Sequence, residues 1–192
     1  MIRKTILAAA ICLASISVAQ AQMSAMAPAA TGPVDPAKTL DAMLTGFEQE
    51  CMGVAKAMPV EKYNFSPALL NIPGAKYGDV MTFVQEVRHI AQANYGYFAR
   101  AGAMKPDVDM KAIGNITTKE EAVKVLASSF AFGHKAIATL TVANAWDPVA
   151  GMGPTGTRAG SAAGGVAHGF DHYGQLVEYL RMNGIVPPAS VK

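Results

Sequence analysis

The sequence predicts an all-α protein, built as a single four-helix bundle. Four stretches carry apolar residues at helical spacing, and segments rich in proline, glycine and polar residues separate them. No stretch alternates apolar and polar residues over enough positions to predict a β-strand. A lone amphipathic helix cannot bury its apolar stripe, so four such stripes favour a bundle around a shared core.

The first helix is predicted from Asp35-Pro36 to about Ala57. Asp35 is a typical N-cap, proline is favoured in the first turn, and Pro59 ends the helix. Its apolar stripe is Leu40, Met43, Leu44, Phe47, Cys51, Val54 and Met58. The position of Cys51 on this stripe predicts a buried, inert thiol. The segment that follows is predicted to be irregular, to a turn at Pro73-Gly74.

The second helix is predicted over 79–101, and a polar, proline-containing connection follows to Asn115. Thr118 and Glu121 form a capping-box pattern that opens a third helix, predicted to reach about Ala145. A glycine-rich loop precedes the fourth helix, predicted over 159–182 and ended by Asn183-Gly184.

Residues 1–21 have the pattern of a secretory signal peptide, which would be removed. A basic start precedes an apolar run, and Ala19-Gln20-Ala21 is a small-residue cleavage site. The apolar run is shorter than the roughly 20 residues that a membrane span needs, which argues against an uncleaved anchor. We therefore expect an exported protein, periplasmic or secreted, with a flexible leader over 22–34, a bundle domain over 35–192 and no stable membrane span after cleavage.

Charge and cysteine content narrow the function further. The chain has 16 basic and 14 acidic residues, and removal of Arg3 and Lys4 with the signal leaves 14 of each. A chain without excess positive charge lacks the usual means of neutralising phosphates, so we expect no nucleic-acid partner. Cys12 also leaves with the signal, and Cys51 alone cannot form an internal disulfide.

Histidines provide the candidate site. His168 and His172 lie four residues apart in the fourth helix, so they project from one face about 6 Å apart along the axis. That spacing lets both imidazoles reach one metal ion, although a hydrogen-bonded pair without metal fits the spacing equally well. His89 in the second helix is the candidate third ligand, whereas His134 in the third helix has no partner and is interpreted as structural or surface.

Three neutral imidazoles suit a divalent transition metal such as zinc, nickel, iron or manganese, and they leave a coordination position open. One observation argues against a metal site that includes His89. On a helical wheel His89 falls nearly opposite the centre of the apolar stripe of its own helix. The site would then occupy a groove at the edge of the core, where Ala93 and Gly165 allow close approach. Glu86, Asp171 and Tyr173 are candidates to orient the ligands, but for both acids a solvated position is favoured.

Three segments carry a family resemblance: 58–67 (Met-Pro-Val-Glu-Lys-Tyr-Asn-Phe-Ser-Pro), Glu86-Val-Arg-His-Ile-Ala, and 168–190, which begins His-Gly-Phe-Asp-His. With these segments the chain resembles the DinB-like superfamily of bacterial four-helix bundles from about Leu40 to Ser190. The family places one metal-binding histidine in its second helix and a His-x-x-x-His pair in its fourth, positions that match His89, His168 and His172. The resemblance also implies an up-down-down-up bundle, a divalent metal near its surface and a homodimer.

Two function classes remain. Characterised relatives include metal-dependent thiol S-transferases, in which the metal holds a small-molecule thiol that attacks an electrophile. Their thiol co-substrates are chiefly cytoplasmic, so for an exported member metal-assisted hydrolysis is a variant of the same hypothesis. The alternative is a non-enzymatic bundle that binds metal or a small ligand, or serves in interactions.

Overall fold

A computed structural model describes residues 31–191, and the signal-peptide prediction and most of the predicted leader lie outside this range. The residues from Asp35 onward form one compact unit. Within the described chain no helix is both long and apolar enough to cross a lipid bilayer.

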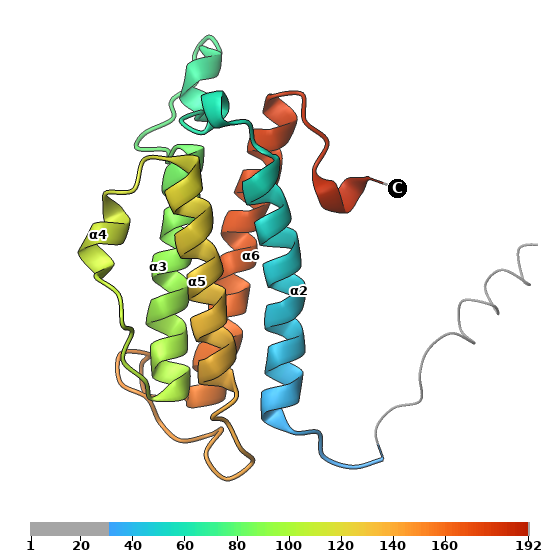
Figure 1. Cartoon of the computed structure of the whole chain (residues 1–192), viewed down its shortest axis with the longest axis vertical. Coiled ribbons are helices and arrows are strands. Elements are labelled where there is room, and N and C mark those ends of the chain that lie inside the picture. The colour runs from blue at the N-terminus through green and yellow to red at the C-terminus, as the bar shows by residue number, and fades with distance from the viewer. Residues whose placement is uncertain (1–30, 192) are drawn as a thin grey trace, which may run out of the picture. The chain divides into compact units, whose positions relative to one another are not determined.

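The described residues fold into helices, as the sequence predicts, and contain no named strand (Figure 1). Pro148 and Thr157 form one isolated β-bridge in the loop before the last helix. Four helices are long: α2 (Pro36–Ala57), α3 (Phe83–Gly102), α5 (Lys119–Ile137) and α6 (Arg158–Met182). The short elements are η1 (Val60–Lys62), η2 (Pro67–Leu70), α4 (Met110–Gly114) and η3 (Pro188–Ser190).

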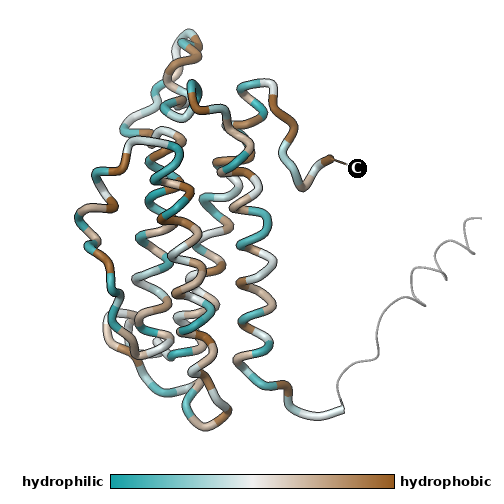
Figure 2. The backbone as a smooth tube through the Cα atoms, in the orientation of Figure 1, coloured by the Kyte–Doolittle hydropathy of each residue, from teal (hydrophilic) through white to brown (hydrophobic). Residues whose placement is uncertain are grey.

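The long helices lie side by side, and each packs on two others. Both α2 and α3 pack against α5 and α6. Hydrophobic positions recur along each long helix in Figure 2, and those that face inward form one core. Its largest fully buried side chains include Phe47, Phe83, Phe98 and Phe130. The amphipathic stripes predicted from the sequence therefore meet at a common core, except that Met43, predicted on the first stripe, is exposed.

Two predicted helix boundaries were wrong. The second long helix begins at Phe83, not Asp79, because the Gln85 side chain accepts a hydrogen bond from the Thr82 backbone N–H (2.7 Å) and caps the helix there. The third ends at Ile137, not near Ala145. Beyond it the Asn144 side chain bonds the backbone of Thr139 and Thr141, and such local bonds compete with helix continuation.

The surroundings of Cys51 and His134 agree with the structural interpretation of both residues. Cys51 is fully buried, and burial raises the pKa of its thiol, in agreement with an inert side chain. His134 on α5 bonds Asp41 (2.5 Å) and Glu48 (3.0 Å) on α2. Partial burial lowers the pKa of His134, but these two hydrogen bonds outweigh it and the pKa is raised. His134 therefore joins α5 to α2, which confirms the structural interpretation.

Gly169 on α6 lets the helix approach the aromatic core. A Cβ at this position would lie 2.1 Å from the ring of Phe47. That ring cannot move freely, because it also packs against Phe130 at 5.2 Å and Phe170 at 5.1 Å between ring centres. The position between the two histidines of α6 thus excludes any side chain.

We predict that Gly169→Ala lowers the free energy of unfolding by about 1–3 kcal/mol, the usual cost of overpacking a core. Gly174→Ala is the matched control in the same helix, since a Cβ there has no neighbouring atom within 4 Å. It should stabilise by roughly 0.5–1 kcal/mol, because alanine favours the helix. Urea unfolding of both metal-free variants measures the difference, and equal stabilities would contradict the packing described.

Candidate metal centre

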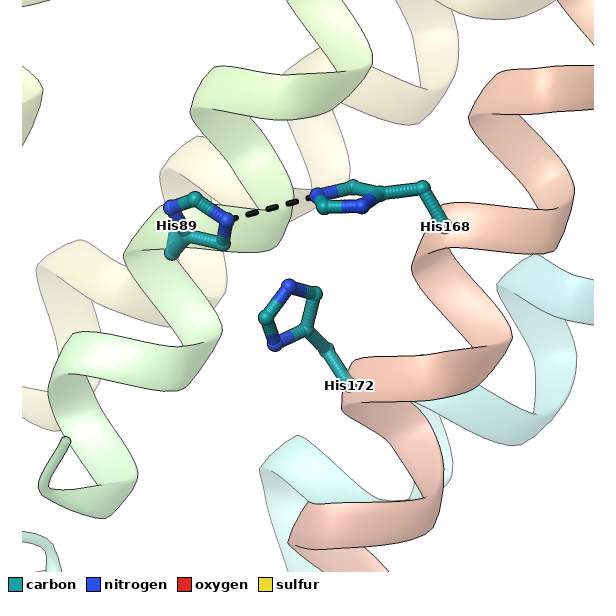
Figure 3. Close-up of side chains that lie close together, drawn as sticks. All are labelled: His89, His168 and His172. Carbon is teal, nitrogen blue, oxygen red and sulfur yellow. Dashed lines mark hydrogen bonds between the residues drawn. The ribbon is translucent and has the colours of Figure 1, made fainter. Parts of the chain in front are cut away.

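Three histidines from two helices meet at one point of the bundle. His89 on α3 points toward His168 and His172, which project from successive turns of α6 (Figure 3). Each offers a ring nitrogen, and these three atoms lie within 4.8 Å of one another. The Nε2 atoms of His89 and His168 are 3.3 Å apart. The pair predicted from spacing and the third ligand predicted from α3 are therefore brought together.

The packing of α3 explains how His89 can join the site although it lies nearly opposite the apolar stripe on a helical wheel. This helix contacts both α5 and α6, and on its side toward α6 the His89 ring centre lies 5.4 Å from that of His168 and 4.5 Å from that of His172. His89 occupies that side and is half-buried, as is His168, whereas His172 is buried. The site thus lies at the edge of the core, within reach of solvent.

Small residues allow α3 and α6 to come this close. A Cβ on Gly165, one turn before His168, would lie 2.9 Å from the Cβ of Tyr97. The Ser161 hydroxyl on α6 also donates a hydrogen bond to the Tyr97 carbonyl (2.8 Å). Gly165 therefore has the close-approach role predicted for it, and α6 is held against α3 just beyond the histidines.

Glu86 is not a solvated surface residue, so that preference was wrong. Its side chain is 1% exposed, and its Oε2 lies 2.7 Å from Nδ1 of His172. A buried carboxylate needs such a partner, because leaving its charge unpaired away from water costs several kcal/mol. Glu86 lies one turn before His89 and beside the buried Val87. This position next to the apolar stripe is the sequence feature that could have indicated a buried Glu86.

The Glu86 contact determines which nitrogen of His172 is free. With Nδ1–H donating to Glu86, the lone pair of His172 is on Nε2, on the other side of the ring. One nitrogen of His172 points at the space between His89 and His168 in Figure 3. The carboxylate therefore orients this imidazole and holds the tautomer that a metal ligand requires.

The other two candidate orienting residues do not act on the histidines in this way. Asp171 is exposed, which agrees with the solvated position favoured for it. Burial, followed by the neighbouring Glu50 on α2, raises the pKa of Tyr173 to about 12. Tyr173 therefore serves the contact between α2 and α6.

Electrostatics favours neutral imidazoles at two of the positions. Burial lowers the pKa of His89, and the neighbouring His172 and His168 lower it further. Burial and His172 lower the pKa of His168, against a smaller opposing effect of Asp171. Since only the neutral ring has a lone pair for a metal, these shifts keep both side chains competent to bind at neutral pH.

The donor set fits a transition-metal ion. Two nitrogens that are each roughly 2.0–2.1 Å from one tetrahedral ion stand about 3.3 Å apart. The Nε2 atoms of His89 and His168 have that separation. Three imidazoles with one oriented by a buried carboxylate are typical of a centre that keeps a further position for water or substrate.

The sequence carries independent evidence of ancestry. Residues 43–176 match the family model of the DinB superfamily, a span that includes all three histidines and Glu86. The chain belongs to the DinB superfamily. No curated protein matches it. Family membership thus supports the helical fold predicted from the resemblance, and it leaves the reaction to be argued from the site.

We predict that Glu86→Gln lowers the zinc affinity of the site by about 10–100-fold, the usual effect of losing a carboxylate that orients a ligand. Glutamine keeps the size of the side chain but removes the charge that stabilises His172 as a ligand. Asp171→Asn is the control, and because Asp171 is exposed its loss should change the affinity by less than about threefold.

Competition titration with a zinc chelator measures both affinities, and urea unfolding of the metal-free proteins checks that each variant folds. Equal affinities for Glu86→Gln and Asp171→Asn would contradict the role assigned to Glu86.

Proposed function

We propose that this DinB-superfamily chain binds one divalent transition metal ion through His89, His168 and His172. The observation that carries the proposal is the convergence of three ring nitrogens within 4.8 Å, one of them on a ring oriented by the buried Glu86. If His89 and His168 only formed a hydrogen bond with each other, neither His172 nor the Glu86 carboxylate would be needed beside them. Zinc, nickel, iron and manganese are the candidate ions, since three imidazoles do not select among them.

We further propose that the centre is used for catalysis on a small molecule. A bound divalent ion supplies Lewis acidity, which lowers the pKa of a thiol or a water and makes it nucleophilic at neutral pH. The chain contributes three imidazoles, of which His172 is oriented by Glu86, and a location at the edge of the core that substrates can reach. A thiol that attacks an electrophile and a water that hydrolyses a substrate both fit these features.

We also propose that the protein is exported and that its four long helices form an up-down-down-up bundle. The signal-peptide pattern of residues 1–21 supports a periplasmic or secreted location. The helix directions in Figure 1, with α2 and α6 running one way and α3 and α5 the other, support an up-down-down-up bundle. This order places the second and fourth long helices next to each other, which the three-histidine set needs.

Metal analysis of purified protein tests the centre. We predict near-stoichiometric metal in the parent protein isolated without an affinity tag. His89→Ala and His168→Ala should each lose at least about 90% of this metal, because two imidazoles bind these ions far more weakly than three. His134→Ala is the matched control, since His134 on α5 pairs with Asp41 and Glu48 on α2, outside the cluster. Its metal content should equal that of the parent.

Absence of metal from the parent, together with failure to take up zinc, nickel, iron(II) or manganese, would overturn the proposal. Equal metal loss in all three variants would contradict the assignment of ligands. Retention of metal without turnover of thiol-reactive electrophiles or hydrolysable esters would favour a non-enzymatic metal-binding bundle.

A further inference from the structure

A cavity of about 340 Å³ lies along the C-terminal half of α3, and one of its lining residues, Tyr97, neighbours His168. Four of its lining residues come from α3 and two from the loop between α5 and α6: Ala93, Gly96, Tyr97, Arg100, Gly151 and Met152. Figure 1 shows this loop at the end of the bundle where α3 ends. The cavity is therefore a recess between one helix and a glycine-rich loop.

The cavity and the histidines share one side of α3. Ala93 lies one turn after His89, and Tyr97 lies one turn further. The Tyr97 ring lines the cavity, and its centre is 5.6 Å from that of the His168 ring. Gly164 packs closely on this ring, since a Cβ there would lie 3.3 Å from the Tyr97 ring and 3.8 Å from Met152. Tyr97 therefore lies beside both the cavity and the histidine cluster.

Arg100 lines the cavity on the C-terminal side of Tyr97. Its guanidinium carbon is 5.7 Å from the centre of the Tyr97 ring, and its Nη1 donates to the Gly96 carbonyl at 3.0 Å. No acidic side chain of the described residues forms an ion pair with it. A guanidinium carries five N–H donors, so most of its hydrogen-bonding capacity is available to a ligand.

The loop is shaped around this arginine. Gly151 has φ +80°, in the left-handed region, and a Cβ there would lie 3.7 Å from Nε of Arg100. The backbone of the loop thus approaches the guanidinium while Met152 covers the side near Tyr97. No other cationic residue lines the cavity, and a single guanidinium matches one carboxylate in charge and in its two-donor geometry.

We propose that Arg100 binds the carboxylate of a small acid whose other end reaches the three-histidine centre. This rests on the proposed function, because the far end of the ligand is placed at the metal. The Arg100 guanidinium and the His168 ring are separated by no more than the sum of their distances to Tyr97, 5.7 and 5.6 Å. The substrate class is therefore a short carboxylic acid with a thiol or another metal-binding group a few bonds away.

The probes are straight-chain mercapto acids from mercaptopropionate to mercaptohexanoate, each compared with the mercapto-alcohol of the same length. Cobalt(II)-loaded protein reports their binding through the thiolate-to-cobalt absorption. For the best chain length the acid should bind the parent at least about tenfold more tightly than the alcohol, because a charge-assisted pair is gained. In Arg100→Gln this preference should fall to about one, with cobalt uptake unchanged.

Arg181→Gln is the matched control, since Arg181 pairs with Glu178 in the last turn of α6 and should keep the parent's preference. An equal preference for acid over alcohol in the parent and Arg100→Gln would overturn the proposal, as would no preference in the parent. Cobalt uptake separates these outcomes from failure of the metal centre.

A second measurement tests Arg100 without metal. Butyrate added to metal-free protein should shift the NMR signals of the Arg100 side-chain N–H and of the Gly96 and Gly151 amides, and the shifts should vanish in Arg100→Gln. If cobalt does not bind the parent but butyrate still causes these shifts, the metal proposal fails and the carboxylate site stands. Absence of shifts together with absence of an acid preference would overturn the site.

Discussion

The buried hydrogen bond between Glu86 and His172 is the interaction on which the candidate centre depends. A carboxylate that is 1% exposed can remain in this place only with a partner, and its partner lies on a different helix. The same contact therefore joins α3 to α6, fixes the His172 ring and determines which ring nitrogen faces the other two histidines. Local stability and ligand geometry are set by one pair of atoms 2.7 Å apart.

Close packing of α6 makes that contact possible. Gly165 and Gly169 have no side chain where one would meet Tyr97 and Phe47, so the helix backbone lies unusually close to α3 and α2. His168 and His172 lie within and just beyond this glycine-containing segment of α6. Because the two helices are close here, the imidazole rings reach α3. Tyr97, which packs on this segment of α6, also lines the cavity that includes Arg100, so one side chain lies beside both the histidines and the cavity.

Much of this arrangement follows from the sequence. The four long helices, the pairing of His168 with His172 and the choice of His89 rest on periodicity, spacing and family resemblance, all of which are local or motif-level signals. Glu86 was a candidate to orient a ligand, but the sequence favoured a solvated position for it, because a helical wheel describes one helix and the partner of Glu86 is on another. Likewise, the end of α5 at Ile137 depends on side-chain bonds of Asn144 in the loop beyond it, which periodicity does not detect.

Anomalous diffraction from crystals of the zinc-loaded protein would show whether three imidazoles hold a single ion. We expect one anomalous peak at roughly 2.0–2.1 Å from a ring nitrogen of each of His89, His168 and His172, with His172 bound through Nε2. A peak elsewhere, or one that contacts His89 and His168 while His172 stays bonded to Glu86 and remote from the ion, would contradict it.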